Sequence, residues 1–346
     1  MNWAAISLIV LAVEAWLACD AAYAQPSSRM LEVLPSILEQ FAGVLPDGAT
    51  RWLGDKRAIY QVPVRNPQLA ALMERARRAD EVVPLTDDLF TAETAAIGLW
   101  HSEFFLDNYG TAIVLAAPLR DDRILVVLVP GIGGSPRDFA DLAPHLQRAG
   151  YQPAYFVYPS GMALGGAAKQ LGKRLRELVE RHDVDRLVVI GHSMGGVVAK
   201  ALLDEIDVDD DLPSWRLFIS ISSPFGGINT AQYADQLPQH PAAWDDLAPN
   251  SAFMRKVQST PFPSDLRFYL FFGARSSNRL MGALGNNDGV LSLDSMCDSP
   301  VTGMAADVFG FYADHTSILA EPLVLRRLDG VMNAELGRQV ASGFDR

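Results

Sequence analysis

The stretch that decides the fold spans residues 188–198 and reads V-V-I-G-H-S-M-G-G-V-V. It contains G-x-S-x-G at Gly191, Ser193 and Gly195, with an apolar, β-branched strand leading in and a helix of small residues leading out. A turn this tight strains the serine backbone and leaves no room for side chains two residues away, which explains both glycines. The pattern predicts that the Ser193 hydroxyl projects from the carboxyl end of a sheet. The amide N–H of Met194, at the helix start, would point toward an oxyanion formed there.

One weaker explanation of these glycines stays open, and a second is disfavoured. A glycine-rich turn can simply pack a helix closely on a strand. A phosphate-binding loop would need a following G-K-[S/T], which is absent here.

Strand and helix patterns alternate around this motif. Apolar strand candidates span 111–116, 123–129, 153–158, 186–190, 216–222 and 266–273, and helical patterns span 137–149, 165–181, 194–205 and about 317–335. Such alternation requires right-handed crossovers and gives a mostly parallel sheet with helices on both faces. We therefore expect an α/β domain over 106–346, preceded at 25–105 by a mainly helical region without obvious chemistry.

Three segments carry a family resemblance. They are G-H-S-M-G-G at 191–196, P-G-I-G-G-S at 130–135 directly after a buried strand, and S-S-P-F-G-G at 222–227. Over roughly residues 106–335 the chain resembles the α/β-hydrolase superfamily, and within it the lipase branch that includes lecithin–cholesterol acyltransferase-like enzymes. The resemblance implies the α/β-hydrolase fold and a serine esterase activity.

The loop at 130–134 is a candidate oxyanion loop. Backbone N–H groups that converge on an oxyanion need a loop without obstructing side chains, and glycines supply one. The N–H of Ile132 is the best candidate for a second donor beside that of Met194. The alternative is a plain glycine turn.

The resemblance also orders the catalytic groups as nucleophile, acid and then histidine. Downstream of Ser193 lie only His240, in a Pro-rich segment, and His315, just before an apolar helix; His315 fits the pattern. The acid should follow the strand near 268–272, where Asn-Asn-Asp-Gly-Val places Asp288. Two other aspartates, Asp294 and Asp298, are the alternatives.

Residues 226–265 form an insert between two core strands and resemble a lid that covers the acyl pocket. It contains large apolar side chains at Tyr233, Trp244, Leu247, Phe253, Met254 and Phe262. The alternative is an ordinary surface excursion with its own hydrophobic cluster. A separate acidic run at 207–211 lacks the spacing and glycine of a calcium loop.

Composition excludes several classes of function. The chain has 346 residues with 29 Lys and Arg against 41 Asp and Glu, a net charge of −12. Phosphate backbones would repel so acidic a chain, so no nucleic-acid partner is expected. Its two cysteines, Cys19 and Cys297, form no C-x-x-C pair, and we expect neither a metal nor a cofactor.

The N-terminus reads as a targeting segment over 1–24. Residues 3–19 are apolar apart from Ser7 and Glu14, and Ala-Tyr-Ala ends at Ala24. This predicts a signal peptide cut after Ala24 and a secreted or periplasmic protein. Because no Lys or Arg precedes the apolar run, a retained membrane anchor stays an alternative, as does a lipoprotein site at Cys19.

We therefore expect a serine hydrolase that cleaves carboxylic esters, with an ester or lipid as substrate and association with a membrane surface as a further expectation. One alternative is a lipid acyltransferase with the same three catalytic residues, because both reactions share the acyl-enzyme. The other is a non-catalytic lipid-binding protein on this fold. The sequence does not indicate acyl chain length, head group or oligomeric state.

Overall fold

The computed structural model describes residues 65–79, 81–120, 122–182, 184, 186–205, 212, 214–236, 240–275 and 286–337. Within these residues a seven-stranded sheet has the order β1-β3-β2-β4-β5-β6-β7. Its strands are β1 Ala112–Leu115, β2 Leu125–Val129, β3 Gln152–Val157, β4 Leu187–His192, β5 Trp215–Ile221, β6 Arg267–Gly273 and β7 Asp307–Phe311. Neighbouring strands are parallel except for β1, which is antiparallel to β3.

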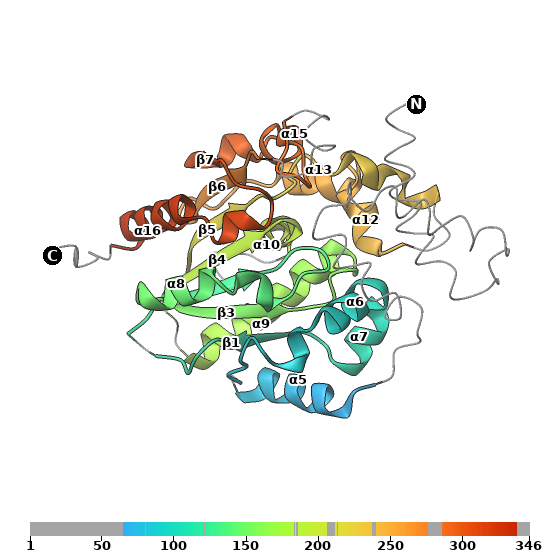
Figure 1. Cartoon of the computed structure of the whole chain (residues 1–346), viewed down its shortest axis with the longest axis vertical. Coiled ribbons are helices and arrows are strands. Elements are labelled where there is room, and N and C mark those ends of the chain that lie inside the picture. Colours follow the sequence, from blue (N-terminus) through green and yellow to red (C-terminus); the bar gives the residue numbers. More distant parts are fainter. Residues whose placement is uncertain are drawn as a thin grey trace.

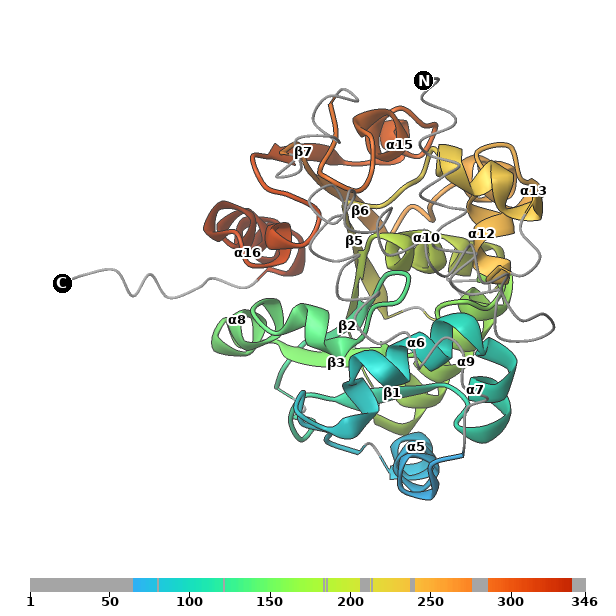
Figure 2. The same cartoon turned by 45° about the vertical axis from the view of Figure 1, so that its right-hand side comes forward.

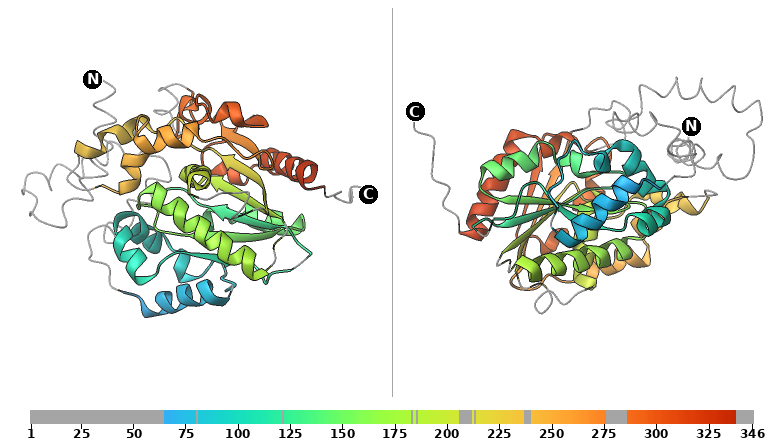
Figure 3. Two further views of the ribbon diagram at one scale, coloured as in Figure 1. Left: turned by 180° about the vertical axis from the view of Figure 1, so that it is seen from behind. Right: turned by 90° about the horizontal axis from the view of Figure 1, so that it is seen from below.

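Helices cover both faces of this sheet, as Figures 1 and 3 show. The α-helices are α5 Pro67–Ala79, α6 Ala92–Trp100, α7 Ser102–Asn108, α8 Leu142–Arg148, α9 Leu164–His182, α10 Met194–Ala201, α12 Ala242–Leu247, α13 Ala252–Ser259, α15 Leu293–Cys297 and α16 Pro322–Leu336. Short 3-10 helices are η1 Asp88–Phe90, η2 Pro136–Phe139, η3 Leu202–Asp204, η4 Asn229–Gln236, η5 Thr302–Met304 and η6 Ser317–Leu319. One core cluster joins α9, α10 and α13 to one face, and a second joins α5, α8 and α16 to the other.

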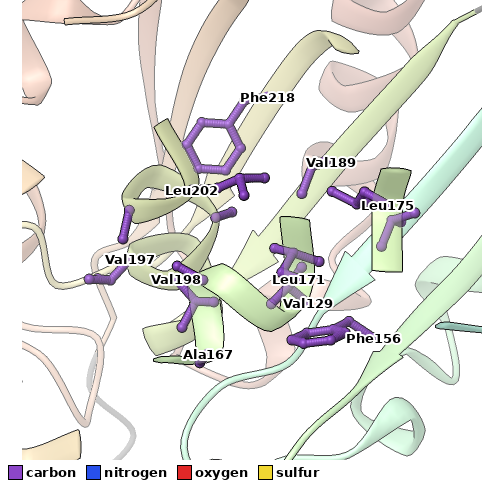
Figure 4. Packing of buried hydrophobic residues seen from close by; sticks show 14 of the residues in the cluster. Val129, Phe156, Ala167, Leu171, Leu175, Val189, Val197, Val198, Leu202 and Phe218 are labelled. Atoms are coloured by element: carbon purple, nitrogen blue, oxygen red, sulfur yellow. The ribbon is translucent and has the colours of Figure 1, made fainter. Parts of the chain in front are cut away.

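Strand β2 shows why the central strands are apolar throughout. Val127 and Val129 belong to the core on the α9 side, whereas Val126 and Leu128 belong to the core on the opposite side. Figure 4 shows Val129 packed among the side chains of α9 and α10. A strand buried on both faces has no position left for a polar residue, which agrees with the L-V-V-L-V sequence of this strand.

The N-terminal helices share this core. Helix α5 lies in the region that was predicted to be mainly helical, and its Met73 is buried in the same cluster as Val126 of β2. Residues 81–83 add to the edge of β1, where Val83 N–H donates to the Leu115 carbonyl at 3.1 Å. The predicted targeting segment, residues 25–64 and the acidic run at 207–211 lie outside the described residues.

The six predicted strands are confirmed to within two residues at each end. The predicted helix at 137–149 is divided into η2 and α8, and the one at 194–205 into α10 and η3. Strand β7 and helix α15 were not predicted. Within the described residues, no helix is long and apolar enough to span a bilayer.

Candidate active site

Ser193 lies on the sharp turn between β4 and α10. Its φ of 55° and ψ of −130° are unusual for a residue with a side chain. A Cβ on Gly191 would lie 2.4 Å from the Gly196 Cα, and one on Gly195 would lie 2.1 Å from the Val129 carbonyl oxygen. Both contacts are with backbone and cannot relax, so the turn requires glycine at both positions, as the sequence predicted.

The loop at 130–134 passes directly beside this serine. A Cβ on Gly131 would come within 2.8 Å of the Ser193 Cβ and 3.3 Å of its Oγ. The loop turns through Ile132 and Gly133, with Gly133 at a φ of 58°, and closes by a 3.1 Å hydrogen bond from Gly134 N–H to the Gly131 carbonyl. The predicted oxyanion loop and the predicted nucleophile are thus neighbours.

Met194 lies next to Ser193 as the first residue of α10. Helix geometry leaves the N–H groups of a first turn without intrahelical carbonyl partners. The Met194 N–H is therefore available to an anion held beside the serine.

Two buried hydroxyls hold the loop from the end of β3. The Tyr158 hydroxyl donates to the Pro130 carbonyl at 2.8 Å, and the Ser160 Oγ accepts the Gly133 N–H at 2.8 Å. Burial, and secondarily Asp138, raises the pKa of Tyr158, so the phenol remains a donor. Neither residue was predicted, although both follow a strand that ends at the same sheet edge as the serine.

His315 and Asp288 form a short hydrogen bond, with 2.6 Å between His315 Nδ1 and Asp288 Oδ2. The Asp288 carboxylate is fully buried, and its other oxygen accepts the N–H groups of Val290 at 3.0 Å and Leu291 at 2.7 Å. Burial alone would raise the pKa of Asp288, but the charge of His315 and these hydrogen bonds outweigh burial and hold that pKa below its ordinary value. Because the carboxylate is ionised and can only accept, His315 Nδ1 carries the proton, which leaves Nε2 as the basic nitrogen.

A backbone hydrogen bond also joins His315 to Asp288. The His315 N–H donates to the Asp288 carbonyl at 2.8 Å. The loops that follow β6 and β7 are thus tied together by one backbone and one side-chain hydrogen bond, although the residues are far apart in sequence.

A second histidine, His192, is buried beneath the first. Its Nε2 lies 2.8 Å from the carbonyl oxygen of His315, and the two ring centroids are 4.9 Å apart. Burial, followed by the neighbouring His315, lowers the pKa of His192 to about 3. Sequence reasoning included His192 only as part of the G-H-S-M-G-G segment that carries the resemblance, and assigned it no role.

The alternative acid and base residues lie elsewhere in the fold. Asp294, on α15, and Asp298, just after it, are both exposed. His240 pairs with Asp245, with 2.8 Å between Nε2 and Oδ1. Of the predicted aspartates and histidines, Asp288 and His315 are the pair that the structure brings together.

The predicted lid insert divides into two parts. Leu247 and Met254 are buried in the main core, and Phe262 stacks on Phe268 of β6 with centroids 4.6 Å apart. The Trp244 side chain of α12 instead meets Trp100 of α6, with ring centroids 5.8 Å apart. Figure 2 shows these two helices at the same end of the sheet.

Trp244 also connects the insert to the oxyanion loop. It forms a small cluster with Ala234 of η4, against which Ile132 and Trp100 pack. Helix α12 is also attached to the start of α9, because the Asp246 carboxylate accepts the Leu164 N–H at 2.6 Å.

Within the part of the chain that the structure describes, no group of three or more His, Cys, Asp or Glu side chains could hold a metal ion. Cys297 is a free, half-buried thiol, and burial followed by Asp294 raises its pKa to about 11.

Comparisons with known proteins identify the fold. A family model described as an alpha/beta hydrolase of unknown function matches residues 163–298. The mature lipase BlEst2 of Bacillus licheniformis superposes with a TM-score of 0.53 at 18% identity, covering 64% of this chain and 97% of the lipase. Its propeptide form gives 0.53 at 18%, covering 68% of this chain and 55% of the other. A metagenomic carboxyl esterase, MGS0156, gives 0.46 at 17%, covering 64% and 80%.

No curated protein matches the sequence. The sheet order, the crossovers, the family model and the two BlEst2 superpositions together show that the chain has the α/β-hydrolase fold, as its resemblance implied.

Proposed function

We propose that this chain is a serine hydrolase that cleaves carboxylic esters, with Ser193, His315 and Asp288 as its catalytic residues. The observation that carries the proposal is the buried 2.6 Å contact between His315 and Asp288 at the sheet edge where the strained turn presents Ser193. Asp288 fixes the imidazole tautomer in which Nε2 is the base. The lipase activity named for the two BlEst2 structures agrees with this reaction class.

The reaction follows from these positions. As the Ser193 Oγ attacks the ester carbonyl carbon, His315 Nε2 takes its proton. The carbonyl oxygen becomes an oxyanion, which the N–H groups of Ile132 and Met194 stabilise. The C–O bond to the alcohol breaks as His315 returns the proton to the leaving oxygen. Water then attacks the acyl-enzyme by the same steps and releases the carboxylic acid and free serine.

A fluorophosphonate probe tests the nucleophile. We expect the Ser193 oxygen to form a bond to phosphorus with loss of fluoride, and peptide mapping to find the label on Ser193. Ser193→Ala should abolish both labelling and ester turnover, while heat-denatured wild type serves as the control for non-specific labelling. A label on another serine, or turnover by Ser193→Ala, would overturn the proposal.

The acyl acceptor is tested separately. Wild-type protein is given an ester panel from short to long acyl chains, with and without a lipid alcohol, and the products are analysed. We expect free acid as the main product in both conditions. Transfer of most of the acyl group to the added alcohol would reassign the protein as an acyltransferase that uses the same residues.

A further inference from the structure

We infer that His192 is a positioning residue that fixes the His315 loop to the nucleophile turn by donating a hydrogen bond from a neutral imidazole. The inference deepens the proposed function and rests on it, because it concerns how the base is kept in register with the serine. In this inference His192 takes no proton in the reaction and acts through the position of His315.

The contact joins two segments that are distant in the chain. His192 is the last residue of β4 and immediately precedes Ser193, while the carbonyl that it contacts belongs to His315. A carbonyl oxygen only accepts hydrogen bonds, so Nε2 of His192 must be the protonated nitrogen. The donor therefore sits one residue from the nucleophile and the acceptor is the backbone of the base itself.

With this contact, three hydrogen bonds fix His315. Its N–H donates to the Asp288 carbonyl at 2.8 Å, its Nδ1–H donates to the Asp288 carboxylate at 2.6 Å, and its carbonyl accepts from His192 at 2.8 Å. His315 donates the first two to Asp288, and it accepts the third from His192 on the nucleophile strand. Without the third, nothing among these bonds relates the imidazole to Ser193, since both others tie it to Asp288 alone.

The surroundings keep His192 neutral. It is 6% exposed, its ring lies against the His315 ring, and the groups that act on its charge are His315 and Asp288. A charged imidazole here would lie beside the imidazolium that forms on His315 during catalysis. A neutral donor supplies the hydrogen bond without that repulsion, which is why histidine suits this position and lysine or arginine would not.

Paired variants separate the hydrogen bond from the packing. His192→Phe retains a ring of similar size but removes the donor, whereas His192→Gln places an amide N–H near the same point. We expect His192→Phe to lower kcat roughly 10- to 100-fold with little change in KM, because a small misplacement of the base costs about that much. We expect His192→Gln to recover a large part of the loss. His145→Phe and His145→Gln, on α8 where His145 pairs with Asp329, are the matched controls.

The pH profile distinguishes positioning from mere stability. Loosening His315 weakens its bond to Asp288, so the imidazolium loses stabilisation and the acidic limb of kcat/KM should move to lower pH in His192→Phe while the plateau falls. A purely structural role would lower the fraction of protein that the fluorophosphonate labels and leave the limb in place. That result, or equal activity of His192→Phe and wild type, would overturn the inference.

A second readout does not require turnover. In protein with ¹⁵N-labelled histidine, we expect a strongly downfield proton from His315 Nδ1–H that broadens or moves upfield in His192→Phe and is restored in His192→Gln. An unchanged resonance in His192→Phe overturns the inference even if Ser193 is labelled normally. Absence of labelling and turnover in the wild type, with the resonance behaving as expected, would contradict the proposed function alone.

Discussion

Ser193 is held in a strained conformation by the backbone on both sides of it. Such strain costs about 1–3 kcal/mol and persists only where the surrounding structure determines it. The Ser193 N–H donates to the Ile221 carbonyl at 2.9 Å, and its carbonyl accepts the Gly196 N–H at 3.0 Å. The turn is therefore fixed by β5 and α10, and the hydroxyl does not depend on a substrate to reach its position.

Asp288 is the residue whose replacement best tests the assigned acid. Asp288→Asn should lower turnover by about 10⁴-fold, because an amide no longer selects the tautomer with Nε2 free. Asp294→Asn is the matched control, and its exposed side chain on α15 predicts a change of a few-fold at most. Steady-state kinetics on a short ester, with circular dichroism to verify folding, make the comparison. Greater damage from Asp294→Asn would reassign the acid.

Lys200 gives the stability a defined pH dependence. It is fully buried on α10, its Nζ donates to the Thr260 carbonyl at 2.5 Å, and burial lowers its pKa from 10.5 to about 8. Between these values the unfolded chain keeps a proton that the folded chain has lost, so stability contributed by this group rises with pH. Below about pH 8 both states are protonated and the cost of burying the charge is present in full.

Lys200→Met should remove this dependence. From pH 7.5 to pH 10, the free energy of unfolding of the wild type should increase relative to that of Lys200→Met by about 2 kcal/mol. Urea unfolding of both proteins at the two pH values measures this difference in free energy of unfolding. Tyrosines and other groups that both proteins share titrate equally, so their contribution cancels. Lys169→Met, at a side chain that is 74% exposed, should show no such change. An equal pH response in wild type and Lys200→Met would show that Lys200 titrates normally.

At the scale of elements, the sequence predicted those with a strong pattern and missed those without one. Strands β2 and β4 are continuous apolar runs because both of their faces are covered. Strand β7 reads D-V-F-G-F, lies at the sheet edge and is only partly buried, so burial imposed no clear pattern on it. Helix α15 has five residues, too few for a helical period to show.

The same contrast holds within the site. Ser193, Asp288 and His315 lie in motifs because their turns demand particular neighbours. Tyr158 and Ser160 each make one hydroxyl hydrogen bond to the 130–134 loop. No turn or motif demands these residue types at their positions, so only the three-dimensional structure shows the contacts.

The insert acts as two elements rather than one. Helix α13 belongs to the core, since Met254 and Val257 are buried there, so a hinge that moves the whole of 226–265 would open the core itself. The part at η4 and α12 also contributes Ala231, Ala243 and Leu247 to this core, but its Trp244 packs against Ile132 of the oxyanion loop. We therefore propose that any role in covering the acyl pocket belongs to the Trp244 side chain and not to movement of the whole insert.

Trp244→Ala tests that assignment. Long-chain esters should lose apolar contact with the indole, so the ratio of kcat/KM for long to short esters should fall by roughly 5- to 100-fold, the equivalent of about 1–3 kcal/mol. Any effect on the oxyanion donors acts on both substrates and cancels in the ratio. Phe253→Ala, on the core-facing helix of the same insert, should lower stability but leave the ratio unchanged. An unchanged ratio in folded Trp244→Ala would make the segment a surface excursion.

At the scale of the whole molecule, the first residues bear on where the protein works. Because an apolar run is followed by an Ala-Tyr-Ala that ends at Ala24, we propose that the protein acts outside the cytoplasm. N-terminal sequencing of protein from fractionated cells should find a mature chain that begins at Gln25. An intact Met1 in the membrane fraction would establish an anchor, and an acylated Cys19 a lipoprotein.

The region from 65 to 110 is joined to the hydrolase sheet through a shared core and a shared edge. Met73 is fully buried with β-strand residues, and residues 81–83 pair with β1. An accessory domain with its own core would unfold by itself, whereas a layer built into the sheet's core should unfold with it. We therefore expect a single cooperative transition in urea, with tryptophan fluorescence and far-ultraviolet circular dichroism giving the same midpoint.

Met73→Ala tests this coupling from the helical side. Truncating a buried methionine should cost about 2–5 kcal/mol, and because the core is shared the whole transition should move to lower urea without splitting. Leu323→Ala, at a side chain that is 57% exposed on α16, is the control and should change stability by less than about 0.5 kcal/mol. Fluorophosphonate labelling of Ser193 should be lost along the same curve as the circular dichroism signal. If Met73→Ala instead produced an early transition that left labelling intact, the helical region would be a separate unit and the catalytic sheet would not depend on it.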